Sequence, residues 1–271
     1  MSTPNLPDPT PPPGADEPVG RMSFFEHLGE LRTRLIHACA AIAIGAFVGV
    51  GVAKHVIGFV MKPMVVALQA AHLQDKLINT DPTGVVSLVI NLGIYLGVVI
   101  ASPYVLYQIW LFVAPGLYKH ERRAVAGFII PSVLLFLVGI AFSYYVILPY
   151  LLRFLVNFQT GLPLTPMINI DEYFSLVLIV LLGVGVIFEL PMVILILSLF
   201  GIVTPAFLWK NFRYAILVIT IVAAIVTPTP DATTMLVFMA PMILLYIIGI
   251  VVSWAVLRRR SGKELARQGA S

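Results

Sequence analysis

Long apolar runs alternate with short polar segments along most of this 271-residue chain. Six runs are candidates for membrane-spanning helices, at about residues 35–53, 83–113, 123–148, 171–200, 214–226 and 233–257. A hydrocarbon core of about 30 Å requires roughly 20 helical residues. The fifth run has only thirteen apolar residues, about 20 Å of helix. The pattern predicts an all-α polytopic membrane protein with six transmembrane helices, one of them short.

The segments outside these runs differ from one another in composition. Residues 1–20 contain seven prolines and few apolar side chains, and such a composition cannot bury a core. We therefore expect a disordered tail, then a membrane domain over 21–257, then a basic tail over 258–271. We expect residues 54–82 to be too polar to cross a bilayer and to pack on its outer surface. Residues 149–170, with Gly161, Pro163 and Pro166, are expected to form an outer loop.

The segment 24–35 precedes the first run and has a helical period. Phe24, Leu28, Leu31 and Leu35 recur at intervals of three and four residues, which predicts an amphipathic helix at the membrane surface. Its polar side carries Glu30, and Arg34 follows four residues later. A Glu–Arg pair at this spacing stabilises a helix, so a purely structural role for Glu30 stays open.

Composition places the chain in the bilayer. It is 59% hydrophobic and 11% charged, with a mean hydropathy of +0.98, whereas soluble domains carry about 25% charged residues. The single cysteine excludes a disulfide framework or a metal site built from several cysteines. No catalytic motif is present: there is no G-x-S-x-G, no H-E-x-x-H and no phosphate-binding glycine loop. An intramembrane hydrolase therefore lacks its nucleophile and base.

The cations are unevenly distributed among the connecting segments. Thirteen of the seventeen Lys and Arg residues fall in the N-terminal segment, the connections between runs two and three and between runs four and five, and the C-terminal tail. Cytoplasmic segments of membrane proteins are enriched in Lys and Arg. The sequence therefore predicts that both termini are cytoplasmic. The formal charge of +4 follows from topology and does not indicate nucleic-acid binding.

Three acids are candidate functional residues. Glu121 is embedded in the cationic segment KHERR at the membrane interface, where an ordinary solvated glutamate is the simpler interpretation. Glu189 lies deep in the fourth run, where an ionised acid costs on the order of 3 kcal/mol. It is either a functional site or a protonated residue hydrogen-bonded to a neighbouring helix. Asp231 follows Pro230 in a very short outer turn, a common position for a structural aspartate.

Five stretches of the chain, in order, resemble the TatC family of twin-arginine protein translocase receptors. They are FFEHLGELRTRL (24–35), KP (62–63), SPYVLYQIWLFVAPGLYKHERR (102–123), FELP (188–191) and TPTPD (227–231). The resemblance implies a six-span, curved and glove-like protein in the bacterial cytoplasmic membrane. It implies function as a receptor and not as an enzyme, with energy from the proton-motive force and no cofactor.

The resemblance also assigns roles to individual positions. Glu30 and Glu121 match the acids that receive the twin arginines of signal peptides; Arg32 is expected to keep those acids ionised, and Phe112 matches a flanking aromatic position. Glu189 matches the groove glutamate where the single-span partners TatA and TatB dock.

Other positions match the family's outer face or depart from its pattern. Pro63 and Asp231 match outer-face positions tied to translocation. Met235 stands where some members carry a partner-contacting glutamine, and Ile247 replaces a glutamate of some members. Other TatC copies are further expected partners. The alternative from another class is a proton-coupled small-solute transporter that uses Glu189 as its carrier.

Overall fold

The computed structural model describes residues 24–73, 77–78, 82–113, 122–160, 168–227 and 231–268, and for 24–27, 122–126, 160 and 259–268 the backbone alone. This part of the chain is helical throughout apart from its connections. The helices are α1 (Phe24–Ala70), α2 (Gly84–Val113), α3 (Arg122–Phe142), the π-helical η2 (Ser143–Ile147), α4 (Leu148–Thr160), α5 (Ile170–Ile187), α6 (Leu190–Leu199), α7 (Pro205–Lys210), α8 (Phe212–Val226) and α9 (Ala232–Gln268).

Five helical stretches in the described residues have the length and apolar composition to cross a membrane. They are Leu28–Ala70, Gly84–Val113, Gly127–Gln159, Ile170–Leu199 and Ala232–Arg258, and Phe212–Val226 is a shorter apolar helix. The predicted all-helical polytopic fold with one short apolar helix is thus confirmed. Short α8 follows from the prolines at 228 and 230, which cannot continue a helix.

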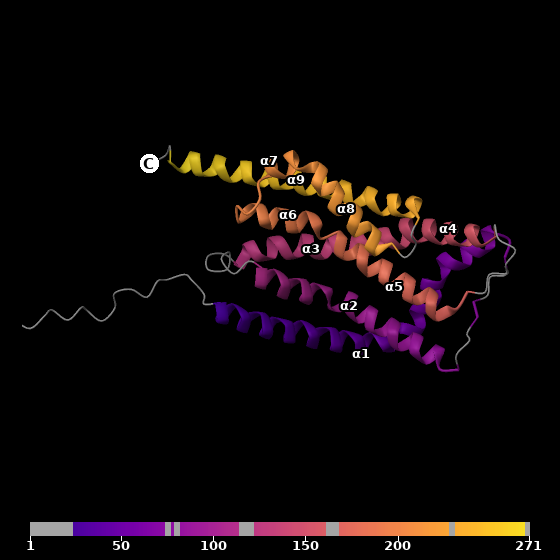
Figure 1. Cartoon of the computed structure of the whole chain (residues 1–271). Coiled ribbons are helices and arrows are strands. Elements are labelled where there is room, and N and C mark those ends of the chain that lie inside the picture. The colour runs from indigo at the N-terminus through magenta and orange to yellow at the C-terminus, as the bar shows by residue number, and fades with distance from the viewer. Residues whose placement is uncertain are drawn as a thin grey trace, which may run out of the picture.

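The helices lie side by side across the molecule, from α1 and α2 through α3 to α5 and α6, with α9 and its neighbour α8 beyond α6 (Figure 1). α1 bends, and its last part crosses toward α4 at one end of the molecule (Figure 1), where the two helices are in contact. α6 packs along α9, and α7 packs on α9 and α8. The start of α1 and the end of α9 lie at the opposite end (Figure 1).

Two segments differ from the sequence-based expectation. Residues 54–70 continue α1 as helix, and their Val60, Met64, Ala67 and Leu68 are buried in the main core. Residues 149–160, expected to be part of an outer loop, form α4 without a break after η2. That expectation was wrong, because the buried side of α4 repeats at helical spacing while its other side is polar enough to resemble a loop.

The contact between α1 and α2 is a contact between backbones. A Cβ added to Gly45 would lie 2.5 Å from the carbonyl oxygen of Gly97, and a Cβ on Gly49 would overlap the carbonyl oxygen of Gly93. Small residues four apart on both helices let the two backbones approach closely, as helices in membranes commonly do. This pair therefore forms the most extensive interface among the described helices.

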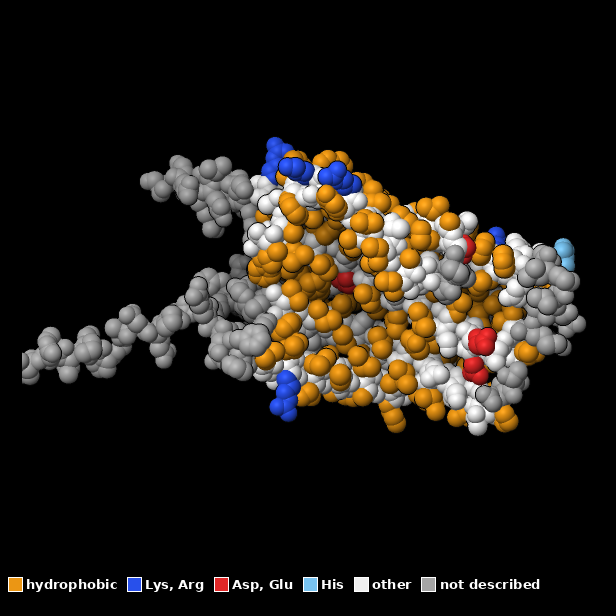
Figure 2. All heavy atoms as spheres, viewed as in Figure 1, with side chains coloured by type: hydrophobic (Ala, Val, Ile, Leu, Met, Phe, Trp, Pro, Cys, Tyr) orange, Lys and Arg blue, Asp and Glu red, His pale blue; other side chains and the backbone are white. Residues whose placement is uncertain are grey.

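Apolar side chains cover the middle of the molecular surface, and charges concentrate at its ends (Figure 2). Phe47, Ile44 and Ile225 are among the most exposed of these apolar residues. Most of the visible Lys and Arg side chains lie at the end where α1 begins and α7 lies, and most of the visible acids lie toward the other end (Figure 2). An apolar belt between polar ends is the surface of a protein that spans a bilayer.

Candidate functional site

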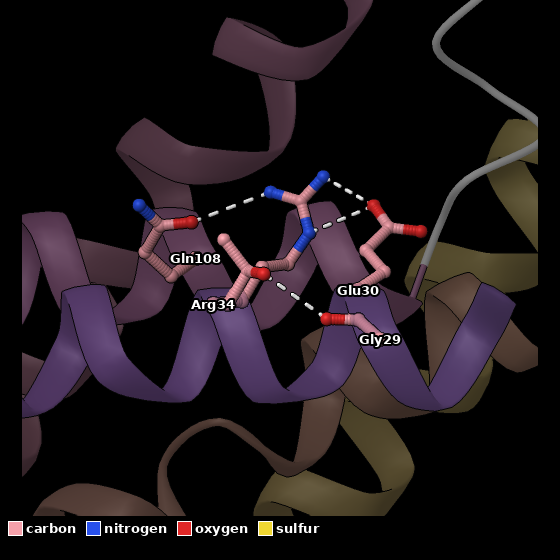
Figure 3. A network of polar contacts seen from close by, with 5 residues as sticks. Gly29, Glu30, Arg34 and Gln108 are labelled. Atoms are coloured by element: carbon pink, nitrogen blue, oxygen red, sulfur yellow. Dashed lines mark hydrogen bonds and ion pairs between the residues drawn. The ribbon is translucent and has the colours of Figure 1, made fainter. Parts of the chain in front are cut away.

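The start of α1 carries an ion pair between two residues one turn apart. Nε of Arg34 donates a 2.9 Å hydrogen bond to Oε1 of Glu30, and Nη2 contacts the same oxygen (Figure 3). Both side chains are half-buried. The predicted pairing of Glu30 with the arginine four residues later is confirmed, and both strong contacts fall on one carboxylate oxygen.

α2 holds the other side of this arginine. Nη1 of Arg34 donates to Oε1 of Gln108 at 3.3 Å, and Nε2 of Gln108 donates to the hydroxyl of Tyr104 at 2.7 Å. Gln108 is buried, and it lies across from Glu30 on the far side of the guanidinium (Figure 3). The ion pair of α1 is thereby fixed to α2, and neither Glu30 nor Arg34 can turn away without breaking these contacts.

These residues border an open hollow of about 510 Å³. Its lining is Gly29, Glu30, Thr33, Arg34, His37, Tyr104, Tyr107, Gln108 and Leu111. Oε2 of Glu30 has no hydrogen-bond partner among the described residues. An ionised carboxylate only accepts hydrogen bonds. Glu30 therefore lines the hollow and keeps one buried, unused acceptor oxygen, while Arg34 holds its other oxygen in place.

Among the predicted signal-peptide residues that the structure describes, only Glu30 lines the hollow. Arg32 is exposed and Phe112 is half-buried in the last turn of α2, and neither lines the hollow. Glu121 lies outside the described residues. The connection that contains it leaves α2 after Val113, two residues beyond the lining residue Leu111.

Glu189 is buried at the junction of α5 and α6, with 7% of its surface exposed. The hydroxyl of Ser132 donates a 2.5 Å hydrogen bond to its Oε2, and Nε1 of Trp110 donates to the Ser132 oxygen at 2.7 Å. An indole N–H only donates, so the order of donors is fixed from α2 through α3 to the carboxyl group. Oε1 of Glu189 has no partner among the described residues.

This arrangement matches the second interpretation of Glu189, a side chain hydrogen-bonded to a neighbouring helix. The sequence did not point to Ser132 or Trp110, since a serine and an aromatic residue are common in an apolar run. Gln108 did offer a signal, because it is an amide within the second run, four residues after Tyr104. Residues at this spacing share one helix face.

Pro63 is buried within α1, near two tyrosines from other helices. A proline has no N–H, so it cannot donate to the carbonyl four residues earlier, which here belongs to Phe59. The hydroxyl of Tyr144 in η2 donates to that carbonyl at 2.7 Å. The hydroxyl of Tyr173 in α5 donates to the next carbonyl, that of Val60, at 2.6 Å. The opened turn of α1 is thus satisfied from outside.

Asp231 caps the start of α9. Its Oδ2 accepts a 2.7 Å hydrogen bond from the backbone N–H of Thr234, and its Oδ1 contacts the Thr234 hydroxyl. This is the N-cap arrangement that satisfies a free N–H of a helix's first turn. Met235 follows in the same turn and is half-buried against the main core. Within the residues that the structure describes, no group of three or more His, Cys, Asp or Glu side chains could hold a metal ion.

Comparison with known proteins gives consistent results across family, sequence and structure. The family model described as "Sec-independent protein translocase protein (TatC)" matches residues 26–241. A TatC protein of Koribacter versatilis (strain Ellin345) is 43% identical, with 97% of this chain and 100% of that protein covered. The TatCy protein of Bacillus subtilis (strain 168) is 35% identical, with 93% and 97% covered.

Solved structures agree. One, "Crystal Structure of Twin Arginine Translocase Receptor- TatC", is 35% identical and superposes with a TM-score of 0.71, covering 85% of this chain and 99% of that one. A second crystal structure of the same receptor in DDM is 36% identical and gives a TM-score of 0.73, with 84% and 99% covered.

Proposed function

The chain belongs to the TatC family of Sec-independent protein translocase subunits, and from this premise we propose that the hollow between α1 and α2 receives the paired arginines of twin-arginine signal peptides. As a member of that family it is the receptor subunit of the twin-arginine translocase, a transport protein and not an enzyme. Membership of this family excludes the alternative function, a small-solute transporter that uses Glu189 as its carrier.

The observation that supports this proposal most directly is the unused oxygen of Glu30. A guanidinium group forms its strongest hydrogen bonds with a carboxylate. Arg34 occupies Oε1, so an arriving arginine that reaches the buried Oε2 adds to the existing pair without displacing it. Gln108 keeps Arg34 in position while this happens.

The second arginine requires a second acid, and we assign that role to Glu121. Its connection begins at the end of α2 that borders the hollow. Arg32 is exposed on α1 and keeps these acids ionised, and Phe112 supplies an aromatic surface beside the peptide.

Peptide binding by the purified full chain in detergent tests the assignment, with a fluorescent twin-arginine signal peptide as the probe. Glu30→Ala and Glu121→Ala are each expected to weaken binding at least tenfold, and the double variant to abolish it. Glu172→Ala is the matched control, since Glu172 is an exposed acid at the start of α5. Binding is also expected to weaken with added salt, because exposed charges are screened. Unchanged binding by the double variant would contradict the proposal.

For the whole molecule we propose six spans in a glove-like arrangement with both termini in the cytoplasm of a bacterial cell, based on the distribution of Lys and Arg. The hollow then opens to the cytoplasm, where signal peptides arrive. A reporter fused after Ser271 tests this orientation by its accessibility in intact cells.

We further assign Glu189 and Met235 to the docking of TatA- and TatB-like single-span partners, and Pro63 and Asp231 to the outer face during translocation. Other copies of the chain are the remaining protein partners, and transport draws on the proton-motive force. The support for Glu189 is its Oε1, which is buried without a partner among the described residues and would pair with a polar side chain that a partner helix inserts at the junction of α5 and α6. Such a pair contributes only about 1 kcal/mol, so it fixes the register of the partner rather than holding it alone.

A further inference from the structure

An apolar cavity of about 280 Å³ lies between α1, α2, α3, η2 and α5. Fifteen side chains line it, and all are aliphatic or aromatic: Val56, Phe59, Val60, Leu92, Tyr95, Leu96, Val99, Leu137, Ile140, Ala141, Tyr144, Tyr145, Leu178, Leu181 and Leu182. The proposed signal-peptide hollow shares none of them. The cavity is therefore a separate feature of the molecule.

The cavity is continuous with the surface that faces the lipid. Leu137 and Phe59 in its wall are each more than one-third exposed, and Tyr145 is 68% exposed. The opposite wall is closed by buried Val60, Leu92 and Leu178. Hydrocarbon chains surround this part of the molecule, and an unfilled apolar space forfeits dispersion contacts with its lining. The cavity thus has an entrance on the bilayer and a closed inner end.

The lining of the cavity favours a thin apolar occupant. A helix with its side chains is about 10 Å across. A single extended acyl chain is much thinner and fits a cavity of this volume. The lining is almost entirely apolar, and the Tyr144 hydroxyl within it is already bound to the Phe59 carbonyl, so a partner helix finds few polar groups to recognise.

A cation stands beside the entrance. Nζ of Lys62 lies 6.0 Å from the centroid of the Phe59 ring, and Phe59 lines the cavity. Lys62 is exposed and one turn further toward the end of α1. No ion pair with Lys62 occurs among the described residues. An ammonium group at the polar end of an acyl pocket is complementary to a phosphate group.

We propose that this cavity is a phospholipid site, in which one acyl chain fills the space between α1, α2, α3, η2 and α5 and Lys62 binds the phosphate. The π-helical turn of η2 shapes the site, since it places Tyr144 and Tyr145 in one wall, and π-helical turns are frequent at functional sites. The lipid lies in the membrane leaflet at which α1 ends. Its role is to fill the core beside the opened turn at Pro63.

Native mass spectrometry of the full chain in maltoside detergent, titrated with dioleoyl phosphatidylglycerol, tests the proposal. We expect one lipid to bind before all others. Lys62→Gln is expected to weaken that binding at least fivefold, and Ala141→Trp, which fills the cavity from an exposed wall position, at least tenfold. Lys54→Gln and Leu134→Trp are the matched controls, because both residues are exposed and neither lines the cavity. The controls are expected to change binding less than twofold.

The variants, a short-chain lipid and a photocrosslinker together distinguish a phospholipid site from a site that binds the headgroup alone and from a helix-docking site. Equal binding by the two test variants and their controls would overturn the proposal. Lys62→Gln changes no core residue, so it remains informative even if Ala141→Trp unfolds. The dihexanoyl lipid is expected to bind at least tenfold more weakly; equal binding, or displacement by inorganic phosphate, would mean that the headgroup alone is recognised. A photocrosslinker at Tyr145 in native membranes is expected to yield adducts of lipid mass. Adducts of polypeptide mass would assign the cavity to a partner helix instead.

Discussion

Gly49 of α1 and Gly93 of α2 approach so closely that no side chain fits between the two helices. A Cβ on Gly49 would lie 3.0 Å from the backbone nitrogen of Gly97 and closer still to the carbonyl oxygen of Gly93. Gly51, two residues further along α1, would place a Cβ in open space, with no other atom within 4 Å. Gly49 and Gly51 are both glycines of α1, and they differ in the atoms that face them.

Alanine at these two positions is expected to have opposite effects. Gly49→Ala forces α1 and α2 apart, and overpacking of this kind costs about 1–3 kcal/mol. Gly51→Ala adds only helix propensity, worth up to about 1 kcal/mol in favour of the folded state. Unfolding in mixed micelles, followed by circular dichroism, measures both. Equal destabilisation by the two variants would show that the close contact does not hold the helices together.

Tyr144→Phe is expected to destabilise the protein by about 1–3 kcal/mol, because it leaves the Phe59 carbonyl, in the turn that Pro63 opens, without a donor. The stacking of the two rings, 4.3 Å between centroids, is retained. Tyr145→Phe is the control, since Tyr145 is largely exposed. In a Pro63→Ala background the restored N–H supplies the missing donor, so the cost of Tyr144→Phe should fall. The same cost in both backgrounds would mean that Tyr144 does not compensate for the proline.

Ser132→Ala is expected to destabilise the membrane domain by about 1–3 kcal/mol, because it removes the acceptor of Trp110 and the donor to Glu189 together. Ser175→Ala provides the comparison, since Ser175 is an exposed serine of α5. The same unfolding measurement applies. A loss of stability no larger than that of Ser175→Ala would show that the hydrogen-bond chain does not stabilise the fold.

Substitutions of Glu189 itself distinguish docking from proton transfer. Glu189→Gln keeps an acceptor for Ser132 and lacks a titratable proton, so it should preserve partner association and much of the transport. Glu189→Ala should weaken the assembled complex. Co-purification of the partners and an export assay measure the two effects. If Glu189→Gln impairs transport as much as Glu189→Ala, and transport no longer depends on the proton gradient, Glu189 is a proton carrier.

Lengthening α8 is expected to impair transport without unfolding the protein. Its 15 residues span about 22 Å at 1.5 Å each, less than a hydrocarbon core of about 30 Å. Local thinning of the bilayer relieves such a mismatch. Four leucines inserted after Val222 add about 6 Å and remove most of the mismatch. The same insertion after Arg258, beyond the apolar part of α9, is the control. Full export by the Val222 insertion would make the short span incidental.

The fold could be predicted from the sequence wherever a run was apolar on all sides, and the expectation failed where it was apolar on one side only. In α4 the buried residues Leu148, Leu151, Leu152 and Val156 recur at helical spacing beside Arg153 and Asn157. A search for continuous apolar runs rejects such a segment, although it is an amphipathic helix. The helical continuation of α1 over residues 54–70 was not predicted for the same reason.

The candidate site could be predicted only where its contacts are local. The Glu30–Arg34 pair is four residues apart, and spacing alone indicates it. Arg34 and Gln108 are separated by 74 residues, and Ser132 and Glu189 by 57. Such partners depend on how helices pack, and the sequence of an apolar run does not indicate which helix faces meet.

The tyrosines that satisfy α1 near Pro63 impose an order on biosynthesis. Tyr144 follows the Phe59 carbonyl by 85 residues, and Tyr173 follows the Val60 carbonyl by 113. At about 5–20 residues per second, the ribosome needs roughly 4–17 s to add the first tyrosine after its acceptor has been made. Throughout that interval the turn at Pro63 has an exposed carbonyl and no partner in its own chain. The nascent protein must keep this part of α1 in contact with water, headgroups or the insertion machinery until its third and fourth membrane helices arrive.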